Sequence, residues 1–190
     1  MEHYHDTGKR ALIVANHSSL LDGILLYAWL PDTPTFAINT RVVENANFKP
    51  LLKFVNLFIM DPSNPLSIKS MIKFIRDDNK AVIFPEGRIS ITGSLMKIYE
   101  GPALIADKAN ATILPIAIEG CQYTPFSYMK GQLKIVWFPR ITMTVLPPES
   151  INIAKNIHGH ARRKAAALIL HRLMYELIYT TYDYRKTVFS

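Results

Sequence analysis

The chain is poor in cysteine, because Cys121 is the single cysteine among 190 residues. One cysteine excludes a disulfide framework within the chain and fits a reducing compartment. No basic group that would activate a thiolate stands beside Cys121 in the sequence. We therefore expect a buried free thiol at this position and not a nucleophile.

Long apolar runs are also missing. Residues 24–30 are apolar and residues 54–60 are apolar except for Asn56, but a membrane-spanning helix needs about 20 such residues. The N-terminal stretch MEHYHDTGKR lacks the apolar centre of a secretory signal. The sequence predicts neither a membrane span nor a signal peptide.

The charge is unbalanced toward the basic side. The 22 Lys and Arg residues exceed the 15 Asp and Glu residues and give a net charge of +7. This balance favours acidic partners, such as nucleic acid, an anionic membrane surface or an acidic protein. A basic cluster at 162–164 would suit nucleic acid, but no base-reading motif accompanies it. We expect no nucleic-acid partner.

Strand-like and helix-like patterns alternate along the chain. The runs typical of strands lie at 11–16, 35–40, 57–61, 81–84, 112–119, 133–138 and 141–146. The runs typical of helices lie at 47–56, 65–76, 101–109 and 159–182, with a further helix that Ser18 or Ser19 would cap and that would end at Leu30. This alternation predicts an α/β fold: a three-layer sandwich with a largely parallel, mixed sheet flanked by helices.

The domain organisation follows from the absence of a linker. No stretch rich in proline, glycine or serine divides the chain, so we expect a single domain over 1–190. Within it, residues 1–10 are expected to form a flexible N-terminus, and 159–182 a C-terminal amphipathic helix.

The first candidate for chemistry is the pair His17 and Asp22, which four residues separate. The pair lies where the first predicted strand gives way to a helix, so the carboxylate can reach one imidazole nitrogen and leave the other as a general base. Acyl transfer to a substrate alcohol needs such a pair and no protein nucleophile. The alternative is a packed histidine with Asp22 on a helix surface.

The second candidate is the stretch FPEGR at 84–88, which ends a predicted buried strand. Gly87 would let a ligand approach the backbone, and Arg88 can bind a phosphate through two parallel hydrogen bonds. Glu86 can hold Arg88 or accept a hydrogen bond from a glycerol hydroxyl, and Lys97 could add a second cation. The alternative is a strand-to-loop turn with a surface ion pair.

Both blocks together resemble the glycerophospholipid acyltransferase family. That family has an NH-x4-D block, an FPEG block and a later proline-bearing strand, which here reads ILPIAI at 113–118. The longer stretches FPEGRISITGSLMKIYEG, IMDPSNPLSIK and ILPIAIEG are similar to the acyltransferase domain of the bacterial bifunctional 2-acylglycerophosphoethanolamine acyltransferases/acyl-acyl carrier protein synthetases. This likeness covers most of the chain.

The resemblance implies a fold, a reaction and roles for residues. The fold would be that of the glycerol-phosphate acyltransferases, with His17 as catalytic base and Asp22 as its orienter. Glu86, Gly87 and Arg88 would bind the glycerophosphate part of the acceptor. The acceptor would be 2-acylglycerophosphoethanolamine, acylated at its sn-1 hydroxyl by an acyl carrier protein thioester, with coenzyme A as the other donor. No metal and no bound cofactor are expected.

Two departures from the family pattern bear on the acceptor and on the whole protein. Phosphatidate-making relatives often carry a Phe-x-x-Arg pattern, whereas residues 58–61 read Phe-Ile-Met-Asp. One fewer cation favours a phosphodiester acceptor over 1-acylglycerol-3-phosphate, which stays the alternative substrate. The chain has no room for a synthetase domain, so it is expected to be an excised domain or a stand-alone enzyme, with a fused synthetase or transporter domain left open. A lipid-binding or carrier-docking module without catalysis is the alternative of another class.

A lipid acceptor also implies contact with a bilayer. Residues 47–58, which read NFKPLLKFVNLF, would form either an interfacial helix or an ordinary core-facing helix. The basic residues Lys69, Lys73 and Arg76 would meet anionic lipid or an acidic carrier protein, or would simply be solvated. The expected location is the cytoplasmic face of the bacterial inner membrane, as a peripheral protein.

Overall fold

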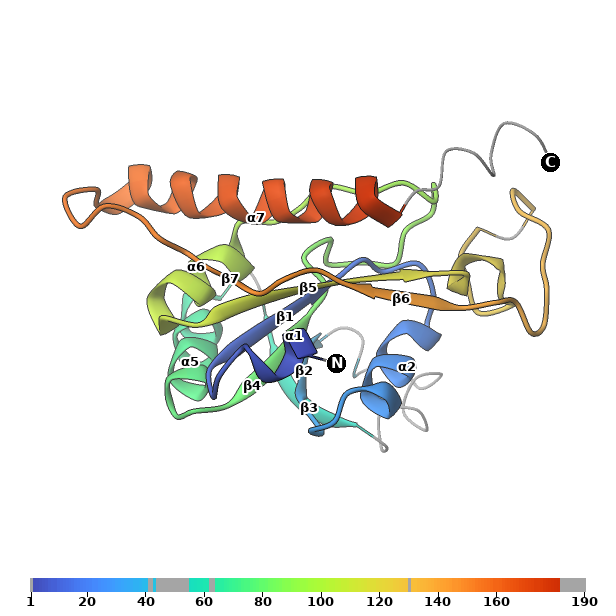
Figure 1. Cartoon of the computed structure of the whole chain (residues 1–190), viewed down its shortest axis with the longest axis horizontal. Helices are drawn as coiled ribbons and strands as arrows, with labels where there is room; N and C mark the ends of the chain where they lie inside the picture. Colours follow the sequence, from blue (N-terminus) through green and yellow to red (C-terminus); the bar gives the residue numbers. More distant parts are fainter. Residues whose placement is uncertain (1, 41–42, 44–54, 62–63, 130, 182–190) are drawn as a thin grey trace.

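The computed structural model describes residues 2–40, 43, 55–61, 64–129 and 131–181. A mixed sheet runs through the molecule and carries helices on both faces (Figure 1). The predicted α/β fold with a largely parallel sheet is therefore confirmed. The helix predicted at 47–56 and the interfacial segment 47–58 lie mostly outside the described residues, and the described part, from residue 56 on, belongs to a strand.

Within the described residues, the sheet has seven strands, in the order β3-β2-β4-β1-β5-β6, with β7 also paired to β5. Their bounds are β1 Ala11–Ala15, β2 Thr35–Asn39, β3 Asn56–Met60, β4 Lys80–Ile83, β5 Thr112–Glu119, β6 Thr142–Val145 and β7 Glu149–Ser150. The pairings among β3, β2, β4, β1 and β5 are parallel, whereas β6 and β7 run antiparallel to β5.

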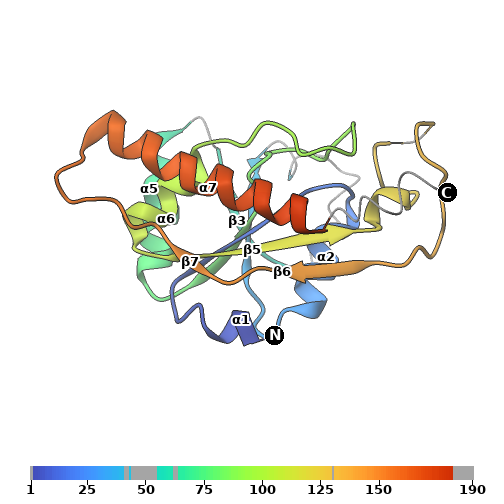
Figure 2. The ribbon, with the colours of Figure 1, turned by 45° about the horizontal axis from the view of Figure 1, so that its top comes forward.

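The helices form two outer layers around this sheet. Their bounds are α1 Glu2–His5, α2 Leu21–Trp29, α5 Pro65–Arg76, α6 Gly101–Ala109 and α7 Gly159–Thr181, with a 3₁₀ turn η1 at Cys121–Tyr123. Figures 1 and 2 show α7 lying across one face of the sheet, with α2 on the opposite side. None of these described helices is long and apolar enough to cross a membrane.

Strand periodicity divides the core into two halves. Along β1, Leu12 and Val14 pack with α5, α6 and α7, whereas Ile13 and Ala15 pack with α2 on the other face. Every residue of β1 is buried, because helices cover both faces of a parallel sheet and its central strands become wholly apolar.

The functional edge follows from this topology. β1 and β4 are parallel neighbours with Val14 paired to Ile83, so both chains leave the sheet at the same edge. The segment after β1 carries His17, and the segment after β4 carries Glu86. In an open α/β sheet, ligands bind outside the carboxyl ends of the strands.

Two sequence predictions fail away from the centre of the sheet. The predicted strand 133–138 forms no ladder; only an isolated bridge at Leu133 remains, and the backbone N–H of Val136 instead donates to the carbonyl of Tyr123 at 2.8 Å. The exposed apolar side chains of this run have no face to pack against, and strand propensity depends on such packing. The N-terminus is not a frayed tail: Glu2–His5 is helical and Tyr4 is buried against the core.

Candidate active site

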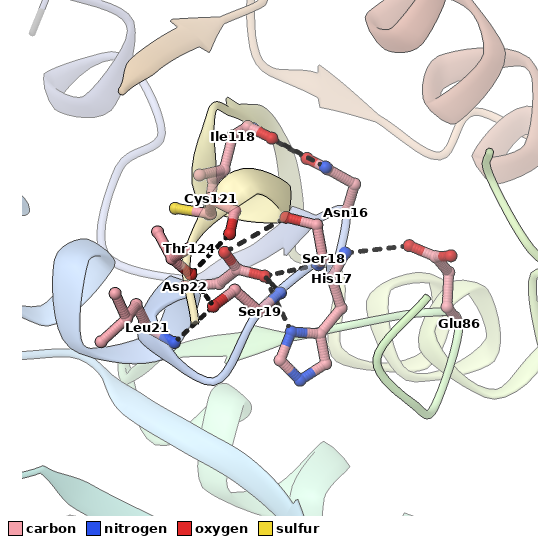
Figure 3. Close-up of polar contacts among 10 residues, drawn as sticks. All are labelled: Asn16, His17, Ser18, Ser19, Leu21, Asp22, Glu86, Ile118, Cys121 and Thr124. Carbon is pink, nitrogen blue, oxygen red and sulfur yellow. Dashed lines mark hydrogen bonds and ion pairs between the residues drawn. The ribbon is translucent and has the colours of Figure 1, made fainter. Parts of the chain in front are cut away.

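Asn16 fixes the end of β1 against β5. Its side-chain amide donates to the carbonyl of Ile118 at 2.9 Å, and its side-chain oxygen accepts from the backbone N–H of Ile118 at 2.7 Å (Figure 3). The side chain therefore extends the strand ladder by imitating a peptide group. The chain is rigidly placed immediately before His17.

His17 and Asp22 meet as the sequence spacing predicted. The imidazole Nδ1 of His17 lies 3.0 Å from Oδ2 of Asp22, and Figure 3 shows the ring turned so that its other nitrogen faces away from the carboxylate. A carboxylate accepts only, so Nδ1 carries the proton and Nε2 is left with a lone pair. The ring is also stacked on Phe84 at 4.0 Å between centroids.

Asp22 is completely buried, and backbone donors compensate its charge. Its Oδ2 accepts from the backbone N–H groups of Ser18 at 2.6 Å and Ser19 at 2.8 Å, besides the imidazole. These charge-assisted bonds stabilise a carboxylate that is closed off from bulk solvent. Of the two cap residues expected, Ser19 contacts the start of the helix: α2 begins at Leu21, and the hydroxyl oxygen of Ser19 accepts from the backbone N–H of Leu21 at 3.3 Å.

Two hydrogen bonds connect the backbone of His17 to Glu86 of the FPEGR turn and to Ser90, which follows that turn. Oε1 of Glu86 accepts from the backbone N–H of His17 at 2.9 Å, and the carbonyl of His17 accepts from the backbone N–H of Ser90 at 2.7 Å. The two sequence blocks that suggested function are thus joined by main-chain hydrogen bonds. The carboxylate–imidazole pair has a fixed position relative to the turn.

Glu86 differs from its expected behaviour. Its second oxygen accepts from the backbone N–H of Met96 at 2.9 Å, and the side chain is buried. Within the described chain no bond joins Glu86 to Arg88, so the expected pairing of these residues is wrong. Burial raises the pKa of the Glu86 carboxyl, although the amides of Met96 and His17 act in the opposite direction.

The glycine and the cations lie on the outer side of this turn. Gly87 has φ of +66°, and a Cβ placed there would lie 3.2 Å from the ring of Tyr99. Arg88 and Lys97 are exposed, and Nζ of Lys97 lies 5.2 Å from the centroid of the same Tyr99 ring. The loop between Glu86 and Glu100 contains no acidic residue. It presents positive charge and an open backbone beside His17, an arrangement suited to an anion.

Cys121 and Thr124 lie next to the residues that bind Asp22. Cys121 is a free, buried thiol, as expected, and burial followed by the nearby charge of Asp22 raises its pKa. Such a thiol is a poor nucleophile. The hydroxyls of Ser19 and Thr124 lie 3.1 Å apart, and that of Thr124 donates to the carbonyl of Cys121 at 2.7 Å.

Several of these supporting residues escaped the sequence analysis. Asn16 stands inside the NH-x4-D block, and Ser18 and Ser19 were considered only as helix caps, so their contacts with β5 and with Asp22 were not predicted. Ser90 and Thr124 gave none, because their partners lie 73 and 105 residues away in sequence. The contact between His17 and Asp22 resembles in geometry the His–Asp part of a Ser-His-Asp triad, in which a hydroxyl of a substrate would take the place of the serine.

Comparisons with known proteins agree with this chemistry. A model of the Acyltransferase family matches residues 1–119, which contain His17, Asp22 and the FPEGR turn. The chain is 29% identical over 148 residues to the 1-acyl-sn-glycerol-3-phosphate acyltransferase of Limnanthes douglasii, which covers 75% of this chain and 51% of that protein. It is 27% identical over 128 residues to the Bacillus subtilis (strain 168) protein of the same name, covering 66% of this chain and 63% of that protein.

A solved structure supports the fold. The 1-acyl-sn-glycerophosphate (LPA) acyltransferase, PlsC, from Thermotoga maritima superposes with a TM-score of 0.58 at 20% identity, over 88% of this chain and 66% of that one. The chain spans about half the length of the plant relatives that it matches, at 51% of each Limnanthes protein. Because the family model matches 119 of the 190 residues, this chain belongs to the Acyltransferase family.

Proposed function

We propose that this chain transfers a fatty acyl group from a thioester to a free hydroxyl of a lysophospholipid, with 1-acylglycerol-3-phosphate as the acceptor. The observation that carries the proposal is the contact of 3.0 Å between Nδ1 of His17 and the buried carboxylate of Asp22. It leaves Nε2 as a base at the carboxyl edge of the sheet, beside a loop whose only charged side chains between Glu86 and Glu100 are basic.

The reaction follows from these groups. Nε2 of His17 removes the proton from the acceptor hydroxyl as its oxygen attacks the thioester carbon. Asp22 stabilises the imidazolium that forms. The tetrahedral intermediate then expels the thiolate, which takes the proton back from His17 and leaves as a thiol. The backbone amides of Ser18 and Ser19 are occupied by Asp22, so they do not serve the oxyanion.

The acceptor is assigned from the relatives and the cations. The matched curated proteins carry the name 1-acyl-sn-glycerol-3-phosphate acyltransferase. Arg88 and Lys97 are both exposed in the loop that follows Glu86, and together they would hold a doubly charged phosphate. This reverses the preference for the ethanolamine lipid that residues 58–61 suggested, because the loop itself offers a second cation in Lys97.

The ethanolamine lipid remains the second candidate. It is favoured by the absence of arginine at 58–61 and by the motif stretches around FPEGR. In that account the donor is an acyl carrier protein thioester, and the enzyme is peripheral to the cytoplasmic face of a bacterial inner membrane. Both acceptors require the same base, so the two candidates differ in acceptor preference and not in the role of His17.

A competition assay separates the candidates. Purified protein is given palmitoyl-acyl carrier protein or palmitoyl-coenzyme A, with 1-acylglycerol-3-phosphate and 2-acylglycerophosphoethanolamine in the same vesicles. We expect faster turnover of 1-acylglycerol-3-phosphate. Arg88→Ala and Lys97→Ala should each raise the acceptor KM by about tenfold or more, because hydrogen bonds to charged groups are worth about 1.5–3 kcal/mol.

A control variant and two contrary outcomes complete this test. Arg163→Ala, which removes an exposed arginine from α7, should leave the acceptor KM unchanged. Turnover confined to the ethanolamine lipid would move the assignment to the second candidate. A folded protein that binds vesicles but turns over neither acceptor would make it a lipid-binding or carrier-docking module.

A further inference from the structure

The segment after β5 exposes an unusual number of large apolar side chains. We call the described residues 123–129 and 131–140 the aromatic loop. Trp137 is 71% exposed and Phe138 is 94% exposed. Its other exposed apolar side chains are Tyr123, Phe126, Tyr128, Ile135 and Val136. Large apolar side chains exposed together in one segment of a folded domain indicate a site of interaction.

The aromatic loop is tied to the rest of the molecule by its backbone. The N–H of Val136 donates to the carbonyl of Tyr123 at 2.8 Å, and the N–H of Leu20 donates to the carbonyl of Phe126 at 3.2 Å. Met129 is buried within the loop and lies against Gly93 of the loop that follows FPEGR. The exposed aromatic side chains therefore project from a fixed base.

Charge on the loop is entirely positive. No aspartate or glutamate occurs between Glu119 and Glu149, whereas this stretch contains three basic residues. Two of them, Lys134 and Arg140, are exposed on either side of the Trp137–Phe138 pair. The loop thus combines aromatic side chains with cations and has no like charge to repel an anionic surface.

This combination fits a lipid surface better than a folded protein. Lysine is depleted from the buried parts of protein interfaces. At a bilayer, tryptophan and tyrosine settle among the headgroups, while nearby lysine and arginine pair with anionic lipid.

The loop also adjoins the candidate active site. Ser19 and Ser127 form an isolated bridge, and a groove of about 380 Å³ is lined by Leu20 together with Pro125, Phe126, Ser127 and Tyr128. Ser19 is one of the two residues whose amides hold Asp22. Figures 1 and 2 show the loop projecting from the end of the sheet toward which β5 runs.

We propose that the aromatic loop is the membrane-contacting element of this domain, inserting Trp137 and Phe138 into the headgroup region of an anionic bilayer while Lys134 and Arg140 contact lipid phosphates. This places the turn between β1 and α2 at the bilayer surface, where a lysophospholipid enters. The inference rests on the proposed function in one respect only, namely that the acceptor resides in a membrane.

Tryptophan fluorescence tests the insertion directly, because the chain has two tryptophans. Trp29→Phe leaves Trp137 as the single reporter, and Trp137→Phe leaves Trp29, which lies in α2. With vesicles of phosphatidylethanolamine and phosphatidylglycerol, the emission of Trp137 should move to shorter wavelength and be quenched by brominated acyl chains. The emission of Trp29 should not change.

Vesicle sedimentation measures the contribution of the loop to binding. The double variant W137A/F138A should partition into these vesicles at least about tenfold more weakly, since burial of one aromatic side chain is worth at least that factor. The matched control is L168A/Y175A, which removes two apolar side chains of α7 that are 69% and 64% exposed. This control should bind like the wild type.

Each contrary result has a defined meaning. Loss of binding in L168A/Y175A but not in W137A/F138A would overturn the proposal and place the contact on α7. A shift of Trp137 emission on addition of acyl carrier protein, or on self-association, without a shift on vesicles would also overturn it. Equal binding to vesicles of phosphatidylcholine alone would refute the part given to Lys134 and Arg140.

Turnover separates this proposal from the proposed function. W137A/F138A should still acylate a short-chain acceptor dissolved as monomers at the wild-type rate, because neither residue touches the candidate active site. Normal vesicle binding by the wild type without turnover of any acceptor would refute the proposed function and leave the membrane-contacting loop intact.

Discussion

Oε1 of Glu86 lies 2.9 Å from the backbone nitrogen of His17, and Oε2 of the same carboxylate lies 2.9 Å from the backbone nitrogen of Met96. One buried side chain therefore joins the segment that carries the candidate base to the loop that carries the candidate anion site. Glu86 acts as a positioning residue, because both of its oxygens are occupied by the protein.

Glu86→Ala should impair both stability and turnover. The change leaves the partly buried N–H groups of His17 and Met96 without acceptors, at up to about 1–3 kcal/mol each in unfolding free energy. Release of the His17 backbone should also lower kcat about 10²-fold, the cost of a misplacement of about 1 Å. Denaturant unfolding and steady-state kinetics measure the two effects. Glu100→Ala, in the same segment but exposed, is the control. Equal effects of the two substitutions would contradict the positioning role.

The stability contributed by Glu86 should depend on pH. Burial raises the pKa of this carboxyl above its ordinary value of 4.5, so the folded protein holds the proton more tightly than the unfolded chain does. The contribution is fully present below pH 4.5 and is lost as pH rises through the raised value. The difference in unfolding free energy between the wild type and Glu86→Gln, taken as wild type minus variant, should therefore decrease as the pH is raised from below 4.5. A difference that grows with pH would show that the amide donors outweigh burial.

Asp22→Asn should reduce activity and stability together. The amide of asparagine places an additional N–H donor next to the N–H groups of Ser18 and Ser19. The substitution also removes the negative charge that would stabilise the imidazolium of His17. We expect kcat to fall by about 10²–10⁴-fold, the worth of a positioned base. The control is Asp78→Asn, which removes only a surface ion pair with Arg10, worth at most about 1 kcal/mol. An Asp22→Asn enzyme with wild-type kcat would refute the role of orienter.

Gly87→Ala should weaken acceptor binding as well as stability. Its φ of +66° is a left-handed conformation, which costs an alanine about 1–2 kcal/mol, and the new Cβ would press on Tyr99 at 3.2 Å. Gly8 has φ of +70° with no atom within 4 Å of its added Cβ, so Gly8→Ala reports the backbone strain alone. Both variants should lose melting temperature, but only Gly87→Ala should raise the acceptor KM. An unchanged acceptor KM in Gly87→Ala would show that this turn does not bind the acceptor.

The parts of the site governed by local or strand geometry were predictable. Four intervening residues between a strand end and the first turn of a helix bring Asp22 to His17. The parallel pairing of β1 and β4 then brings the FPEGR turn to the same edge. Asn64 caps α5 by accepting from the N–H of Leu66 at 2.9 Å, as an asparagine directly before a helix often does.

The rest depended on long-range contacts that local patterns do not encode. The carboxylate of Glu86 suggested a partner in the neighbouring Arg88, but it is used by an amide 69 residues away. The run 133–138 has the composition of a strand, yet its side chains lack a packing face and stay exposed. Strand propensity alone cannot distinguish a sheet edge from the aromatic loop.

The most direct test of the central claim is acyl transfer to 1-acylglycerol-3-phosphate by His17→Ala, measured beside its melting temperature. The account predicts a loss of turnover of at least about 10²-fold in a protein that still folds, because the amides of Ser18 and Ser19 continue to hold Asp22. Turnover that survives the substitution, or that disappears only together with the fold, would contradict the role of His17 as the base.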